Sequence, residues 1–333
     1  MNSYINIGNL KTINAELSNY CNAACPMCPR YDFDLQLIKT ITNNSHTTLD
    51  SFKTNIGPEV LSGLKRFYSC GVLGDGTMNP ECLHIYEYVK QCGGAYLSIN
   101  TNGGARTKEF WHDLGKLGVN VTFSIDGLHD TNHLYRRNVK WDRLITNVQS
   151  YIQAGGNAKW DFLVFKHNQH QLEEAEQLSK KLGFKVFQKK WTTRWDDFDS
   201  DGNWMEREAV EVDDYKLEKV TPQINSQTYS TAQKSPISTD SFATRKINCF
   251  SFHNSNSEIY IAANGDVSPC CWLGDLKQHE AKNIIDDYNK ININHAKLSD
   301  ILEGTFFNKL SDGIQGKADA YRLQTCYHTC GVN

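Results

Sequence analysis

Residues 12–28 read TINAELSNYCNAACPMC, a largely apolar run that leads into three closely spaced cysteines. The aliphatic and β-branched residues at its start predict a β-strand over 12–17. The cysteines that follow, Cys21, Cys25 and Cys28, have the spacing CxxxCxxC with no local fourth cysteine. Zinc sites usually use two pairs of ligands. Three thiols alone suit an iron–sulfur cubane in which one iron lacks a protein ligand.

Strand-like runs alternate with longer helical patterns from residue 12 to about residue 191. Leu178 and Leu182, for example, recur at helical spacing, and Gly183 follows them as a stop signal. Such alternation predicts a parallel sheet with right-handed crossovers, either an open sheet or a barrel. The predicted strands are 12–17, 67–73, 95–100, 120–125, 160–165 and 185–189. The predicted helices are 50–65, 81–91, 107–117, 141–154 and 171–182.

Residues 192–246 have a different character, because they are polar and keep no steady period beyond a weak helical pattern over 204–212. We interpret them as a lid or a plain solvated linker. Beyond residue 247, Asn264-Gly265 lies between two strand-like runs, 258–262 and 266–272, and predicts a β-hairpin. A helix is predicted over 298–310. The expected domains are 1–191, 192–246 and 247–333.

Composition excludes several classes of protein. The 333 residues carry 35 Lys and Arg against 38 Asp and Glu, a net charge of −3, which disfavours nucleic acid as a partner. A hydrophobic content of 39% with 11% aromatic residues is enough for a folded core. The sequence has no apolar run long enough to cross a membrane and no signal peptide at its start, so we expect a cytoplasmic protein without a membrane partner.

The CxxxCxxC loop after the first strand resembles that of the radical S-adenosylmethionine (SAM) enzymes. This resemblance implies a partial (β/α)6 TIM-like barrel and a [4Fe–4S] cluster that binds SAM at its open iron. Cys21, Cys25 and Cys28 would be the ligands of this cluster. Met27 occupies a position where many members have an aromatic residue, and its thioether is expected to pack on the adenine of SAM.

Four further segments resemble family segments that approach SAM, and they follow successive predicted strands in chain order. They are GDG at 74–76, NTNG at 100–103, SIDG at 124–127 and HLYRR at 133–137. In the last of these, the resemblance implies that Arg137 binds the SAM carboxylate through the fork of its guanidinium, with Arg136 as the competing candidate. The other expected SAM contacts are Gly74, Asp75, Gly76, Asn100, Asn102, Ser124 and Asp126.

A second set of cysteines lies near the end of the chain. Cys249, the Gly265-x4-Cys270 spacing and the final pair resemble the SPASM and twitch domains that follow the barrel in one branch of the family. The resemblance implies a small α+β domain with one auxiliary [4Fe–4S] cluster. Cys271 is an alternative to Cys270, and a four-cysteine zinc site is the alternative to the cluster. The expected ligands are Cys249, Cys270, Cys326 and Cys330.

The resemblance also implies the chemistry. An electron from a donor such as flavodoxin or ferredoxin would cleave SAM to a 5′-deoxyadenosyl radical, which removes hydrogen from a substrate. A peptide or peptide-like substrate is expected, although no N-terminal peptide-binding domain is evident. One alternative is dehydrogenation of a small alcohol or sugar-like metabolite with the auxiliary cluster as electron acceptor. An alternative of another class is a non-catalytic iron–sulfur or zinc protein. Lys166 and His167, just past the fifth strand, are candidate catalytic residues at the rim of the site.

Overall fold

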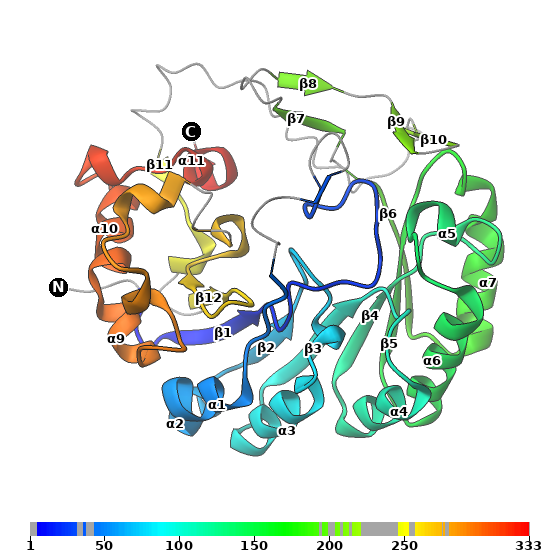
Figure 1. The fold of residues 1–333 in the computed structure, drawn as a ribbon, viewed down its shortest axis with the longest axis horizontal. Coiled ribbons are helices and arrows are strands. Elements are labelled where there is room, and N and C mark those ends of the chain that lie inside the picture. The colour runs from blue at the N-terminus through cyan, green and yellow to red at the C-terminus, as the bar shows by residue number, and fades with distance from the viewer. Residues whose placement is uncertain are drawn as a thin grey trace. The chain divides into compact units, whose positions relative to one another are not determined.

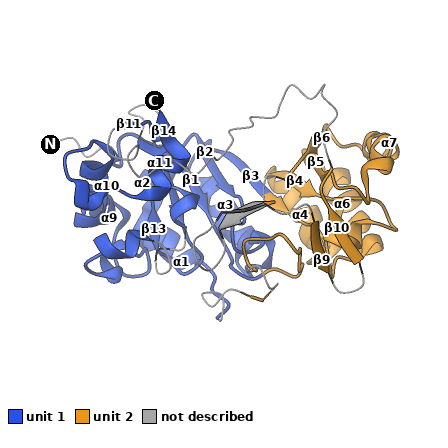
Figure 2. Cartoon of the chain, turned by 90° about the horizontal axis from the view of Figure 1, so that it is seen from above, with its two compact units in different colours: residues 1–20, 39–99, 237–333 blue, residues 21–38, 100–236 orange. Residues whose placement is uncertain are grey.

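The computed structural model describes residues 5–31, 36–37, 43–192, 195–198, 204–206, 209–212, 215–220, 246–252, 257–274, 276 and 280–332. The chain forms two compact units that do not follow consecutive blocks of sequence (Figure 2). Unit 1 comprises residues 1–20, 39–99 and 237–333, and unit 2 comprises residues 21–38 and 100–236.

Unit 1 is built on strands from both halves of the chain, in the order β13-β12-β1-β2-β3. Strand β1 lies between two parallel neighbours, with Ile13 opposite Ile259 on one side and Phe67 on the other. All three of these side chains are fully buried, as expected for a strand covered on both faces. The strands are β1 (Leu10–Ala15), β2 (Arg66–Ser69), β3 (Tyr96–Thr101), β12 (Ser257–Ile261) and β13 (Val267–Ser268). The last two residues of β3 are counted with unit 2.

The helices of unit 1 agree with the sequence in place but not in continuity. The predicted helix 50–65 consists of α1, a π-helical segment (Phe52–Ile56) and α2. The predicted helix 298–310 divides at Gly304, whose backbone is extended. Phe67 packs edge-on against Phe52 and Tyr86, which holds the first helices on the sheet. The helices are α1 (Leu49–Ser51), α2 (Gly57–Ser62), α3 (Cys82–Cys92), α9 (Leu298–Glu303), α10 (Thr305–Ile314) and α11 (Gln324–Cys330).

The predicted hairpin after residue 257 is confirmed. β12 and β13 pair antiparallel, with Tyr260 opposite Ser268. The turn needs Gly265, whose φ of +93° is accessible to glycine at no steric cost. The second strand is shorter than predicted and ends at Ser268, because Cys271–Leu273 forms a 3-10 turn instead.

Unit 2 contains the parallel strands β4, β5 and β6, and helices α4, α6 and α7 cover one face of them (Figure 1). That face holds an aromatic core in which Phe123 contacts Trp111 and Tyr151, and Trp160 contacts Phe184. The strands are β4 (Asn120–Ser124), β5 (Ala158–Leu163) and β6 (Val186–Lys190). The helices are α4 (Lys108–Leu117), α5 (Asn132–Tyr135), α6 (Trp141–Gln153) and α7 (Leu172–Leu182).

The helical pattern over 204–212 is a wrong prediction. The described residues there form strands instead, which pair as two antiparallel hairpins, β7–β8 and β9–β10. Val210 and Val212 alternate with exposed Glu211, which is the period of a half-buried strand rather than of a helix. Four residues are too few for this alternation to stand out in the sequence. The strands are β7 (Asp196–Phe198), β8 (Trp204–Glu206), β9 (Ala209–Val212) and β10 (Tyr215–Glu218). Two short strands complete unit 1, β11 (Lys246–Ile247) and β14 (Gly331–Val332).

Candidate functional site

The three cysteines of the CxxxCxxC motif lie in a tight loop at the start of unit 2. The backbone N–H of Cys28 donates to the carbonyl of Cys25 over 3.0 Å, and that of Tyr31 donates to the carbonyl of Cys28. Cys25 is buried, and Cys21 and Cys28 are half-buried. Burial raises the pKa of the Cys25 thiol to about 11, although the Arg136 guanidinium opposes the shift. A metal must therefore displace a proton from this thiol when it binds.

Two side-chain donors point at sulfurs of this loop. Asn102 Nδ2 lies 3.6 Å from Cys21 Sγ, and Arg136 Nη1 lies 3.4 Å from Cys25 Sγ. Hydrogen bonds to cysteine sulfurs are typical of iron–sulfur sites, where they stabilise thiolates. The residues present therefore fit the [4Fe–4S] group that the motif implies, with Cys21, Cys25 and Cys28 as the three thiolates.

The NTNG segment after β3 is held against the cysteine loop. Asn102 and Asn22 exchange amide hydrogen bonds of 2.9 and 3.3 Å. A Cβ on Gly103, whose φ is +69°, would lie 2.6 Å from Leu144 and 2.8 Å from Phe123, so glycine is required here. The sequence prediction that this segment meets the cysteine loop is confirmed for Asn102.

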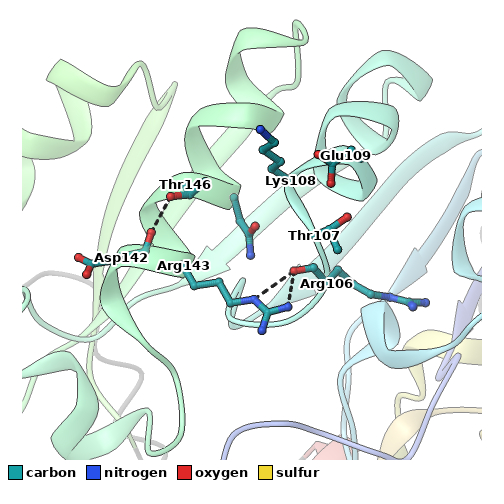
Figure 3. Close-up of a pocket in the computed structure, with 8 residues that line it drawn as sticks. Arg106, Thr107, Lys108, Glu109, Asp142, Arg143 and Thr146 are labelled. Atoms are coloured by element: carbon teal, nitrogen blue, oxygen red, sulfur yellow. Dashed lines mark hydrogen bonds between the residues drawn. The ribbon is translucent and has the colours of Figure 1, made fainter.

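The same segment is fixed from its other side by α6. Asn147 Nδ2 donates to the carbonyls of Gly103 and Ala105, over 2.8 and 3.0 Å. The guanidinium of Arg143 donates through two nitrogens to the carbonyl of Arg106 (Figure 3). These residues line a cavity of about 370 Å³ between the starts of α4 and α6. None of its lining residues is a cysteine, so its described role is to position the loop that carries Asn102.

Asp126 of the SIDG segment is fully buried and anchored from several directions. Its Oδ2 accepts from Arg136 Nε over 2.5 Å, and its Oδ1 accepts from the backbone N–H of Leu163 over 2.6 Å. Asn132 Oδ1 accepts from the backbone N–H of Asp126, and Asn168 donates to its carbonyl. Burial raises the pKa of Asp126, while Arg136 opposes that shift. Because a guanidinium stays protonated in proteins, the pair is ionic.

Arg136 and Arg137 contact the cysteine loop in different ways. The guanidinium of Arg136 lies between Asp126 and Cys25, whereas Arg137 contributes its backbone carbonyl, which accepts from the N–H of Ala24 over 3.1 Å. The side chain of Arg137 is half-buried. Its expected contact with the SAM carboxylate stays a prediction, as do those of Asn100, Ser124 and Met27.

The GDG segment belongs to unit 1, where it follows β2. Asp75 Oδ1 accepts from the N–H and the hydroxyl of Thr77, over 3.0 and 2.7 Å. A Cβ on Gly74 would lie 2.0 Å from the carbonyl oxygen of Ser18, so the loop approaches the end of β1 closely. The sequence analysis placed Asp75 as a SAM contact. The described geometry engages one of its carboxylate oxygens in capping a 3-10 turn.

Sequence reasoning missed Glu16, which organises this loop. Its buried carboxylate accepts from the backbone N–H groups of Leu73 and Gly74 and from the hydroxyl of Tyr260. The only sequence signal was an acidic residue directly after an apolar strand, which is too common to interpret. Through Tyr260, Glu16 connects the GDG loop to strand β12.

The second cysteine set gathers in unit 1. β11 pairs with β14, and the N–H of Asn248 donates to the carbonyl of Cys330 over 2.8 Å, which brings Cys249 and Cys330 into hydrogen-bond contact. That bond lowers the pKa of Cys330 to about 7. Burial raises the pKa of Cys270 and of Cys326 to about 12, with a further contribution from Cys330 in each case.

Cys271 faces different neighbours from Cys270. Burial raises its pKa to about 11, and the nearby charges that add to the shift are Cys70, Glu258 and Glu16. Cys249, Cys326 and Cys330 do not contribute, which favours Cys270 as the fourth member of the set. Among the described residues, no group of three His, Cys, Asp or Glu side chains is close enough to hold a single metal ion. A four-iron cluster is larger and needs its thiolates further apart.

The rim residues after β5 lie under the β9–β10 hairpin. Lys166 forms an ion pair with Glu218 at 2.9 Å, and the His167 ring stacks on Phe165 and meets Tyr215 edge-on. Burial lowers the pKa of His167 to about 4. In the described part of the chain, neither ring nitrogen of His167 has a hydrogen-bond partner. A catalytic role for Lys166 or His167 stays a prediction.

Comparisons with known proteins agree with this geometry. The model of the radical SAM superfamily matches residues 15–179, and that of an iron–sulfur cluster-binding domain, SPASM, matches residues 249–331. The first implies a SAM-binding [4Fe–4S] cluster and the second implies auxiliary iron–sulfur. No curated protein sequence matches significantly.

Solved structures of low sequence identity share the fold. Streptococcus suis SuiB bound to S-adenosylmethionine aligns with a TM-score of 0.51 and 15% identity, over 81% of this chain and 62% of that one. SuiB bound to its precursor peptide SuiA gives 0.54 and 13%, over 91% and 67%. The sulfatase-maturase structure titled anSMEcpe with bound AdoMet gives 0.54 and 12%, over 97% and 85%.

These likenesses confirm the predicted fold class, an α/β partial barrel followed by a small SPASM-like domain. The chain spans less than two thirds of the SAM-bound SuiB chain. None of the helices in the described ranges is long and apolar enough to cross a membrane. The chain belongs to the radical SAM superfamily, with an iron–sulfur cluster-binding SPASM domain at residues 249–331.

Proposed function

We propose that this chain is a radical SAM enzyme that modifies a peptide or peptide-like substrate. The observation that carries the proposal is the Cys21, Cys25 and Cys28 loop, in which two of the three sulfurs receive side-chain hydrogen bonds. When bound, a [4Fe–4S] cluster with one iron free of protein ligands supplies the electron that cleaves SAM. An external donor of the flavodoxin or ferredoxin class would provide that electron.

The residues of the chain have separate tasks in this proposal. Cys21, Cys25 and Cys28 hold the cluster, and Asn102 and Arg136 orient the loop through two of its sulfurs. Arg137 is proposed to bind the SAM carboxylate. Cys249, Cys270, Cys326 and Cys330 would hold one auxiliary cluster. The peptide substrate class is supported by the fold shared with SuiB, whose structure was solved with its precursor peptide.

A second candidate is dehydrogenation of a small hydroxylated metabolite, which one feature of unit 2 favours. On strand β5, Asp161 forms ion pairs with Lys159 at 3.0 Å and with Lys190 of the neighbouring strand β6. This charged strand face, away from the buried Trp160 and Phe162, suits a hydrophilic ligand better than an apolar side chain.

The test is anaerobic incubation of the reconstituted protein with SAM and a chemical reductant. We expect 5′-deoxyadenosine and methionine to form, and the triple Cys21, Cys25 and Cys28 to Ala variant to form neither. A protein with about four irons at this site that never cleaves SAM would exclude the proposal. Deuterium transfer from labelled peptides or from labelled sugar alcohols into 5′-deoxyadenosine separates the two substrate classes.

A further inference from the structure

Arg136 occupies an unusual position for a residue of an arginine pair beside a SAM site. It ends the short helix α5, and its side chain is 19% exposed. Its Nε lies 2.5 Å from Asp126 Oδ2, and its Nη1 lies 3.4 Å from Cys25 Sγ. One guanidinium therefore bridges a carboxylate and a cysteine of the CxxxCxxC motif, all within unit 2.

The geometry uses the two edges of the guanidinium for different acceptors. Its Nε is committed to Asp126, whose other oxygen already accepts from the N–H of Leu163. Because Asp126 is fully buried and anchored on both oxygens, it fixes the plane of the guanidinium. A planar fork that is held at one side presents its remaining N–H groups in a set direction, which a lysine ammonium cannot do. That direction is toward the Cys25 sulfur.

The charges around Arg136 favour this arrangement. Burial by itself lowers the pKa of Arg136, but Asp126, Cys25 and Tyr135 together raise it well above its ordinary value. The guanidinium also lies over the Tyr135 ring, 5.2 Å from its centroid. Asp126 neutralises the charge of Arg136 at long range, so the effect on Cys25 is a directed N–H dipole at short range.

We propose that Arg136, held by Asp126, donates a hydrogen bond to the Cys25 thiolate of the SAM cluster and raises the reduction potential of that cluster. Arg136 is thus a positioning residue for the cluster and does not bind the SAM carboxylate. This inference rests on the proposed function, because it needs a cluster on Cys25. Hydrogen bonds to cysteine sulfurs and nearby positive charge are among the factors that set iron–sulfur potentials.

The test is a redox titration of the reconstituted protein without SAM, monitored by electron paramagnetic resonance. Arg136→Lys keeps the charge but loses the fork, and Arg136→Gln loses both. In both variants we expect the ratio of reduced to oxidised cluster at the wild-type midpoint to fall about tenfold, a shift of about 59 mV for one electron. SAM affinity, measured separately as a dissociation constant, should stay within about twofold (0.4 kcal/mol).

Arg137→Lys is the matched control, one residue away. We expect the opposite pattern, in which SAM affinity falls and the potential without SAM does not move. If the Arg136 variants bind SAM poorly at an unchanged potential, Arg136 is the carboxylate ligand and the inference is overturned. If the wild-type protein holds no cluster on Cys21, Cys25 and Cys28, the proposed function itself fails.

A measurement on protein with an intact Arg136 covers the case in which its variants do not assemble a cluster. The Arg137→Lys protein is labelled with 15N-arginine, and its reduced cluster is examined by electron spin echo modulation. The inference expects a 15N coupling from a guanidinium whose nitrogen lies 3.4 Å from a ligand sulfur. Absence of that coupling would overturn it.

Discussion

Glu16 should be worth more to the stability of unit 1 than a typical buried residue of its size. Its carboxylate is the acceptor for two backbone N–H groups, of Leu73 and Gly74, and for the Tyr260 hydroxyl. Burial raises the pKa of Tyr260 well above its ordinary value, so this phenol remains a donor at every working pH. Replacing Glu16 with Ala leaves all three donors buried without an acceptor.

The magnitude follows from these contacts. Each buried donor left unpaired costs about 1–3 kcal/mol, so the Glu16→Ala variant should lose at least about 3 kcal/mol of unfolding free energy. At about 2–4 °C per kcal/mol for a large domain, this corresponds to a fall in Tm of roughly 6–12 °C. Tyr260→Phe removes one of the three hydrogen bonds and should lose about 1–1.5 kcal/mol.

The assay is thermal unfolding of the reconstituted protein under anaerobic conditions, followed by circular dichroism. Glu258→Ala is the matched control, because Glu258 on β12 accepts one side-chain hydrogen bond, from Tyr68 at 2.7 Å, and is half-buried. It should cost less than Glu16→Ala. A Glu16→Ala protein that unfolds within about 2 °C of the wild type would refute the reasoning that this carboxylate holds the GDG loop to β12.

Three other changes test separate parts of the structure. Gly103→Ala should lose about 1–3 kcal/mol of unfolding free energy in urea denaturation, because φ is +69° and the new Cβ meets Leu144; an unchanged midpoint would contradict this. His167 has a folded pKa of about 4, below its ordinary 6.5, so the unfolded chain binds the proton first. Stability should therefore fall as the pH drops from about 6.5 toward 4, and the His167→Gln variant should show a flatter profile there. Cys270→Ser should reduce the iron content from about eight to about four per chain whereas Cys271→Ser should not, and the reverse result would reassign the ligand.

The sequence predicted the parts of the site that are local. The CxxxCxxC spacing and the NTNG and SIDG segments are each written within a few residues, and Asn102 and Asp126 lie where those segments imply. The choice between Arg136 and Arg137 was beyond it. Adjacent residues point in different directions, and the backbone at Arg136 turns out of the helix with φ −83° and ψ 61°. A change of that size is decided by packing, not by residue type.

Long-range partners were equally inaccessible. Glu16 binds Leu73 across 57 residues of sequence and Tyr260 across 244, and no local pattern specifies such pairs. The sequence also assigned the wrong period to 204–212, because strands of three and four residues carry too few side chains to display an alternation. The two compact units were not predicted, because unit 1 draws on both halves of the chain.

The parallel pairing of β1 with β12 has a consequence for biosynthesis. Strand β1 leaves the ribosome early, yet its partner at Ser257–Ile261 is made almost 250 residues later. Until then, one flank of β1 offers unpaired amides and carbonyls to any other nascent strand. Contacts this distant along the chain also slow folding. Newborn chains halted before residue 257 should therefore depend on chaperones to stay out of aggregates.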